Sequence, residues 1–190
     1  MHYEFSPIRY AAREVAAITG VSEQSQRNWR ARGFLPPNET GKHFRADVFD
    51  LAVLNVANLI ADRLPVERAV SLATICGRGV ARFALVGIEA WVGDIGDPFP
   101  LGLEHHGTKA AFDRYGNAAR VLTPQYFFLW ADGSELWDMF PNRAFDAASA
   151  DQLAGPVLVL DLAALGKNLI ARKSPLVMVK RVAVPSLMIT

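Results

Sequence analysis

Apolar positions spaced three and four residues apart predict a helix close to the beginning of the chain. Ala12, Val15 and Ala16 would share one face of a helix over residues 11–19. Gly20 follows directly, and glycine can adopt the positive φ of a tight turn without a Cβ clash. We therefore expect a short helix that ends in a sharp turn.

A second, polar helix is predicted immediately after this turn. Ser22 is a suitable N-cap because its hydroxyl can accept a hydrogen bond from an unpaired N–H group of the first turn. Gly33 stands where a glycine commonly ends such a helix. Helix, glycine-containing turn and polar helix is the helix-turn-helix pattern, whose second helix enters the major groove of DNA.

This first third of the chain resembles the MerR-type winged-helix family. The groups that match the family signature in order and spacing are Glu14-Val15-Ala16, Gly20-Val21-Ser22, Arg27, Trp29 and Gly33-Phe34-Leu35-Pro36. The wing of the family would correspond to residues 37–44, with the sequence Gly41-Lys42-His43-Phe44. Gln26 departs from the family by replacing a residue that is usually apolar. Arg30 stands where the family often has an acid, and it makes the surface more basic, which favours phosphate binding.

The resemblance implies that the second helix and the wing contact double-stranded DNA. On a helical wheel one arc is shared by Ser22, Glu23, Gln26, Arg27 and Arg30. Gln and Arg side chains suit base edges, whereas basic residues at the wing would contact phosphates. The alternatives are a solvated helix face and, for Trp29, a core anchor with one exposed edge. The expected DNA-binding residues are Arg13, Ser22, Glu23, Gln24, Gln26, Arg27, Trp29, Arg30, Lys42, His43 and Arg45.

Two more helices would complete an N-terminal domain over residues 1–76. Asp47 is a suitable N-cap for a largely buried helix that continues to about Arg63. Pro65 fits the first position of the helix after it. The stretch Gly77-Arg78-Gly79 is the expected domain boundary.

Residues 80–190 are predicted to form a small mixed α/β domain. Asp132-Gly133 is a strong hairpin signal, and a two-residue turn there would place Phe128 opposite Trp137. The elements expected after the hairpin are a strand over 156–160, a helix over 162–172 capped by Asp161, and a strand over 176–184. This order indicates a right-handed crossover between parallel neighbouring strands.

Two stretches have no clear periodicity. Residues 1–9 are expected to be a lead-in, in which Pro7 disfavours a helix. The apolar run 80–92 fits either a buried helix or a strand.

Composition narrows the class of protein. The chain has 190 residues, of which 51% are hydrophobic and 10% aromatic, as in folded globular proteins. No apolar run is long enough to span a bilayer and residues 1–4 do not form a charged leader, so we expect a cytoplasmic protein without membrane contact. The lone Cys76 excludes a disulfide framework and a thiolate metal cluster.

The net charge of +1 conceals a polarised distribution. Between Arg9 and Arg45 the chain has seven Lys or Arg residues and three Glu residues. After Asp161 it has five basic residues and no acid. This distribution suits a protein that places one basic face on phosphates and turns another face away.

The remaining candidates for chemistry are weak. His105-His106 would point apart on a strand and have no third ligand at a helpful spacing, so a surface loop is expected there. The acids Asp94, Asp97, Asp132, Glu135 and Asp138 are not accompanied by a nucleophile motif, a phosphate loop or a metal pattern. We therefore expect no enzyme activity, no cofactor and no metal.

The aromatic residues of the hairpin exceed what two strands can bury alone; they are Tyr126, Phe127, Phe128, Trp130, Trp137 and Phe140. One face should pack on the strand-helix-strand unit. The other face would be further core, or would meet a partner subunit or a small-molecule or protein effector.

These observations predict an α+β protein with an N-terminal MerR-like winged helix-turn-helix domain and a small mixed α/β C-terminal domain. The expected function is that of a sequence-specific transcriptional regulator that binds a pseudo-palindromic DNA site as a homodimer. One alternative is a phage or mobile-element DNA-architecture factor, similar to excisionases or packaging proteins. Another is an enzyme or protein-interaction module whose helix-turn-helix binds protein.

Overall fold

The computed structural model describes residues 2–35, 43–94 and 124–182, and its fold is mixed α+β, as expected. In chain order the elements are β1 (His2–Pro7), β2 (Tyr10–Ala11), α1 (Ala12–Thr19), α2 (Glu23–Ala31), β3 (Arg45–Ala46), α3 (Val48–Ile60), α4 (Val66–Leu85), η1 (Ile88–Ala90), β4 (Trp91–Gly93), β5 (Tyr126–Leu129), β6 (Glu135–Asp138), α6 (Pro141–Asp146), β7 (Leu158–Asp161), α7 (Leu162–Arg172) and β8 (Val177–Val182). Within these ranges no helix combines the length and the apolarity needed to cross a bilayer.

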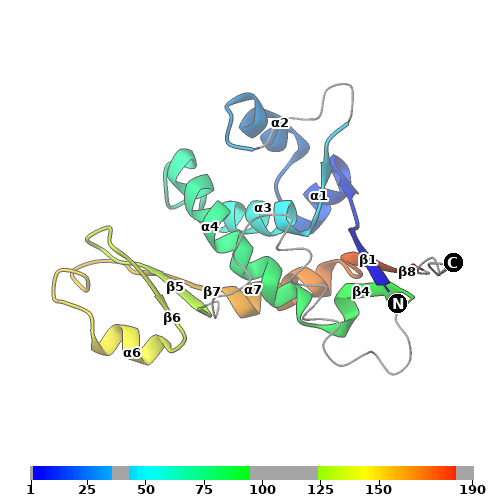
Figure 1. Cartoon of the computed structure of the whole chain (residues 1–190). Coiled ribbons are helices and arrows are strands. Elements are labelled where there is room, and N and C mark those ends of the chain that lie inside the picture. Colours follow the sequence, from blue (N-terminus) through cyan, green and yellow to red (C-terminus); the bar gives the residue numbers. More distant parts are fainter. Residues whose placement is uncertain (1, 36–42, 95–123, 183–190) are drawn as a thin grey trace, which may run out of the picture.

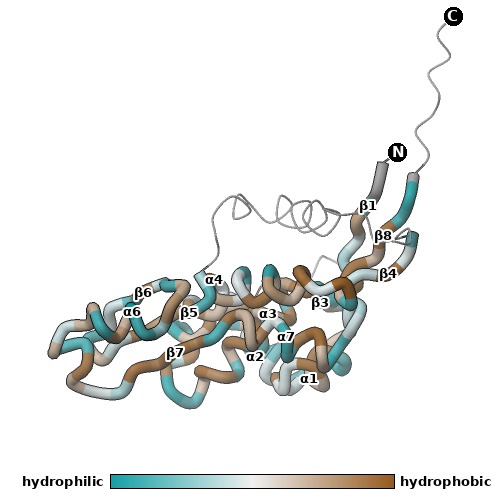
Figure 2. Tube along the Cα trace, turned by 90° about the horizontal axis from the view of Figure 1, so that it is seen from below, coloured by the Kyte–Doolittle hydropathy of each residue, from teal (hydrophilic) through white to brown (hydrophobic). Residues whose placement is uncertain are grey.

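The helices form the middle of the molecule and separate two small sheets (Figures 1 and 2). Strands β1, β4 and β8 lie at one end, and β5, β6 and β7 lie with α6 at the other. The short pair of β2 and β3 runs beside α1. Buried side chains from α1, α3, α4, α7 and the strands join in one hydrophobic cluster.

Helix α4 is the central element, and both α3 and α7 pack against it (Figure 1). A Cβ atom at Gly77 of α4 would lie 2.8 Å from Cγ2 of Val53 in α3 and 2.9 Å from its backbone. A Cβ atom at Gly166 of α7 would lie 2.7 Å from the backbone nitrogen of Ala84 in α4. These distances leave no room for a methyl group, so the two glycines permit the close approach of all three helices.

Helix α3 begins as its sequence predicts. Oδ1 of Asp47 accepts hydrogen bonds from the backbone nitrogens of Phe49 at 2.9 Å and Asp50 at 3.3 Å. Oδ2 of Asp50 accepts one from the Asp47 nitrogen at 3.0 Å, which completes a reciprocal cap. The helix ends at Ile60, close to the expected Arg63, and most of its side chains are buried.

The chain does not break at Gly77-Arg78-Gly79, where the sequence favoured a domain boundary. These residues lie in the interior of α4, which continues to Leu85 and so settles the ambiguous run after residue 80 as helix, then η1 and β4. Glycine disfavours a helix interior by roughly 1 kcal/mol relative to alanine, but burial against α3 and α7 outweighs that penalty. The division into domains at residues 76 and 80 stays a prediction.

The expectation of a lead-in over residues 1–9 is wrong, because His2–Pro7 forms strand β1. This strand pairs antiparallel with β8, from His2 opposite Val182 to Pro7 opposite Val177. Strand β4 pairs parallel with the other edge of β8. No local pattern predicts such a pairing, since the paired residues are 170 to 180 positions apart in the sequence.

The predicted hairpin is present, but its register differs by one residue from the expected one. Phe127, and not Phe128, lies opposite Trp137, with ring centroids 4.8 Å apart. The last backbone pairs join Trp130 and Ser134, so the loop has three residues, with Gly133 at a φ of 85°. A three-residue loop with a left-handed glycine adds one residue relative to the two-residue turn that we assumed.

The expected crossover between parallel strands is also wrong. Strand β7 pairs antiparallel with β5 in a sheet of order β6-β5-β7, whereas β8 belongs to the sheet with β1 and β4. Helix α7, capped by Asp161 as predicted, therefore connects two different sheets. The strand-helix-strand order was read correctly, but the strand partners depend on contacts outside that segment.

The hairpin aromatics divide between two cores. Phe127 is fully buried in the main cluster, whereas Phe128 and Trp130 stack at 5.4 Å in a second cluster under α6. Phe140 remains 62% exposed. An interface or effector role for the exposed part stays a prediction.

We predict that Gly77→Ala destabilises the protein by about 1–3 kcal/mol, because the added methyl group would overlap the backbone of α3. Urea unfolding monitored by circular dichroism measures the change. Gly87→Ala is the matched control, since its Cβ would meet only the exposed, flexible end of Glu89. Equal stability of the two variants would contradict the close packing of α3 on α4.

Candidate nucleic-acid interface

The turn between α1 and α2 forms as its residues predict. Gly20 has a φ of 80° and donates its N–H to the carbonyl of Ala16 at 2.9 Å. The Ser22 hydroxyl caps α2 by accepting a hydrogen bond from the Ser25 nitrogen at 3.0 Å. Val21 between them is buried. These local bonds fix the direction in which α2 leaves α1.

The end of α2 is equally well defined. Gly33, at a φ of 76°, donates its N–H to the Arg30 carbonyl at 2.9 Å, and the Phe34 N–H reaches the Trp29 carbonyl at 2.8 Å. This pair of bonds is the Schellman motif, which satisfies the last carbonyls of a helix. The predicted helix end at Gly33 is confirmed.

Gln26 does not lie on the exposed arc to which the helical wheel assigned it. Its side chain is fully buried, and its Nε2 donates to the carbonyls of Ala12 at 3.0 Å and Val21 at 2.9 Å. The amide thus ties α2 to the start of α1 and to the turn, where an apolar residue would only fill space. Because Gln26 is enclosed, it is not available to a base in this conformation.

Trp29 takes the position of a core anchor. It is half-buried and packs against the main hydrophobic cluster. The interpretation of Trp29 as a core residue with one exposed edge is therefore confirmed.

The opposite face of α2 is open to solvent and polar. Arg27 donates to Oε1 of Gln24 at 3.0 Å, and Nε2 of Gln24 donates to Oδ1 of Asn28 at 2.8 Å. These three side chains and Ser22 are exposed. Their mutual hydrogen bonds lie on the surface, so exchange for bonds to another polar partner requires little desolvation.

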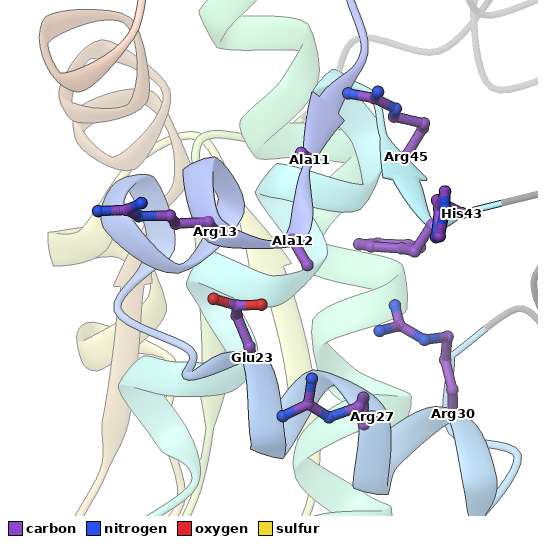
Figure 3. Close-up of a pocket in the computed structure, with 9 residues that line it drawn as sticks. Ala11, Ala12, Arg13, Glu23, Arg27, Arg30, His43 and Arg45 are labelled. Carbon is purple, nitrogen blue, oxygen red and sulfur yellow. The ribbon is translucent and has the colours of Figure 1, made fainter.

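A pocket of about 420 Å³ lies between α1, α2 and the start of β3 (Figure 3). Its lining consists of Ala11, Ala12, Arg13, Glu23, Arg27, Arg30, His43, Phe44 and Arg45. The lining thus contains four arginines, one histidine and one acid. Arg30 extends from α2 toward the side occupied by His43, Arg27 extends toward the side of Glu23, and Arg13 points away from both (Figure 3). The sequence had assigned all of these charged residues to one surface, but Lys42 lies outside the described residues.

Arg30 is the most constrained arginine of this pocket. Its guanidinium carbon lies 3.8 Å from the centroid of the Phe44 ring, and its buried Nη1 atom has no hydrogen-bond partner among the residues that the structure describes. Burial lowers the pKa of Arg30, the charge of Arg27 lowers it further, and Asp50 acts in the opposite direction. The wing predicted from the sequence includes Phe44, but no contact was predicted for it. The only sequence signal for a contact with an arginine is that basic residues flank Phe44 in the chain.

Residues 172–175, at and after the end of α7, contact β2 and α1. Nη1 of Arg172 donates to the carbonyl of Ile18 at 3.1 Å, and the Tyr10 hydroxyl donates to the carbonyl of Pro175 at 2.7 Å. Nζ of Lys173 lies 3.9 Å from Oε1 of Glu14, an ion pair. These contacts join α1 to the end of α7, and no sequence signal foretold them because each spans more than 150 residues.

The acids considered as catalytic candidates have structural partners where they are described. Asp132 accepts hydrogen bonds from Ser134 in the hairpin loop, and Asp138 binds Arg143 through both carboxylate oxygens at 2.7 and 3.0 Å. Asp94 accepts the N–H of Arg181. Asp97 and the pair His105-His106 lie outside the described residues. Among the residues that the structure places, no group of three or more His, Cys, Asp or Glu side chains is arranged to hold a metal ion.

Comparisons with known proteins add no identification. No protein-family model matches the chain, and no curated protein matches it. The function must therefore be argued from the geometry above.

Asp50 should make the stability of the protein depend on pH. Burial and the neighbouring charge of Asp47 raise its pKa to about 6 in the folded state. The folded protein then binds more protons than the unfolded chain between about pH 4 and 6, so stability falls as the pH rises through this window. The contribution is up to about 3 kcal/mol.

We predict that Asp50→Asn flattens this dependence, because the amide keeps an acceptor for the Asp47 N–H and has no charge to bury. Thermal unfolding between pH 4 and 7.5 should show the variant gaining stability over the parent as the pH rises. Asp62→Asn, at an exposed position, is the control. If the stability difference between Asp50→Asn and the parent stayed constant across this pH range, the raised pKa of Asp50 would be contradicted.

Proposed function

We propose that the protein binds double-stranded DNA in a sequence-specific manner and regulates transcription. The observation that carries this proposal is the division of α2 into two faces. Gln26 and Trp29 attach the helix to the body, whereas Gln24, Arg27 and Asn28 remain exposed. A rigidly held helix with a free polar face is what insertion into a major groove requires.

In this proposal the N-terminal region acts as a MerR-like winged helix-turn-helix. Arg27 and Gln24 would reach base edges, since amide and guanidinium groups can form paired hydrogen bonds there. Arg13, His43 and Arg45 would contact the sugar-phosphate backbone and fix the orientation of the helix. The excess of positive charge at the pocket supports this division of roles.

A single short helix contacts too few base pairs to select a site in a genome, so we propose that the protein binds as a homodimer. The C-terminal region would then serve self-association or the sensing of an effector. Exposed apolar side chains near α6, including Phe140 and Phe145, support a role in association.

We predict that Arg27→Ala combined with Arg30→Ala weakens DNA binding by about 100-fold or more, because two charge-assisted contacts are lost. Fluorescence anisotropy with labelled duplexes measures the affinity. Arg78→Ala removes one exposed arginine of α4 that does not line the pocket, so it is the control for the loss of a positive charge elsewhere. This variant should bind DNA like the parent. DNA binding by the double variant as tight as that of the parent would show that α2 is not the recognition helix.

We also predict that selection from a random DNA pool yields a symmetric motif with two half-sites. Half-sites contacted by a two-fold dimer on one face of DNA lie about 10 base pairs apart, centre to centre, or a multiple of that distance. An asymmetric motif would contradict binding as a two-fold dimer. Strong bending of the selected DNA without any change in promoter activity would favour the architectural alternative.

A further inference from the structure

Arg30 is held by an aromatic ring. Its guanidinium carbon lies over Phe44 at 3.8 Å from the ring centroid, and cation–π attraction favours this position. A guanidinium group donates hydrogen bonds only in its own plane. The ring therefore fixes the position of the guanidinium group, whose N–H groups remain donors.

Phe44 is a fixed platform because of its place in the chain. It directly precedes β3, and β3 pairs with β2 through Ala11 opposite Arg45 and Tyr10 opposite Ala46. Tyr10 and Ala46 are buried in the main core. The ring thus belongs to the body of the protein, and it sets the position of an arginine that extends from the last turn of α2.

Nη1 of Arg30 is buried, and no described residue forms a hydrogen bond with it. The carboxylate of Asp50 attracts Arg30, but its Oδ2 already accepts the N–H of Asp47. Arg27 repels Arg30, which adds to the cost of the arrangement. A site that gathers guanidinium groups in this way is stabilised by an anion between them.

The two ends of the pocket differ in charge. Glu23 lies at the end next to Ala12, whereas Arg30 lies at the end next to His43 (Figure 3). An anion is repelled from the first end and attracted to the second. The volume of about 420 Å³ is more than sufficient for a tetrahedral phosphate group.

We propose that the part of this pocket between α2 and β3 is a binding site for one phosphate group, with Arg30 as its central donor and Phe44 as the residue that positions Arg30. The proposal rests on the proposed function, in which the phosphate belongs to the DNA backbone. Arg30 would then fix the register of α2 on DNA, and base reading would fall to Arg27 and Gln24. Arg45 and His43 line the same pocket.

The first experiment measures DNA affinity against salt concentration. Arg30→Ala should weaken binding about tenfold on specific and unrelated duplexes alike, and it should reduce the slope of log K against log salt by about 1. Phe44→Leu keeps the apolar bulk without the aromatic face, so it should weaken binding several-fold, whereas Phe44→Tyr should restore it. Thermal unfolding of each variant verifies that the fold persists.

Two results of this experiment would overturn the proposal. One is a loss of preference at a single base position in Arg30→Ala with an unchanged salt slope, which would make Arg30 a base-reading residue. The other is equal affinity of Phe44→Leu and the parent, which would remove the positioning role of Phe44.

The second experiment does not depend on DNA. Titration with inorganic phosphate, monitored by the NMR signals of arginine Nε–H groups, should shift a signal that is missing in Arg30→Lys. Phosphate binding in a protein without DNA affinity would support the pocket and contradict the proposed function. DNA binding by a protein in which phosphate leaves the Arg30 signal unchanged would support the function and overturn the pocket.

Discussion

The packing of α4 between α3 and α7 is the constraint on which the rest of the structure depends. Gly77 and Gly166 allow the three helices to approach within backbone distance, and almost every buried residue of the core joins the cluster around them. Through α3 this packing supports β3 and α1, and through α7 it supports the two sheets at opposite ends. Gly77, where the sequence favoured a boundary, thus lies at the contact of α4 with α3.

The candidate interface inherits its rigidity from this core. Helix α1 packs on α3, and the end of α7 is tied to α1 through Arg172 and Ile18. Helix α2 is in turn bonded to α1 by the buried amide of Gln26. The polar face of α2 is consequently displayed from a fixed base, which reduces the conformational entropy that binding a rigid duplex would cost.

The interface combines exposed polar groups with an excess of positive charge among the described residues that line the pocket. Arg27 and Arg30 repel each other. The partner that positions Arg30 is the aromatic ring of Phe44, in the role that a carboxylate commonly has. In the proposal made above, such an arrangement attracts an anion. In the proposed function this attraction supplies orientation on the phosphate backbone, while the exposed amide and guanidinium groups of α2 supply sequence preference.

Local chemistry was sufficient to predict the helix caps at Ser22 and Asp47, the end of α2 at Gly33, and the hairpin at Asp132-Gly133, because each depends on residues only a few positions apart. It also located the stretch that carries the candidate interface. Four features required the tertiary structure: the pairing of β1 with β8, the hairpin register, the burial of Gln26 and the contact of Arg30 with the Phe44 ring. Three of these join segments that meet only after the core has formed, and the register was decided by a single loop residue that periodicity does not count.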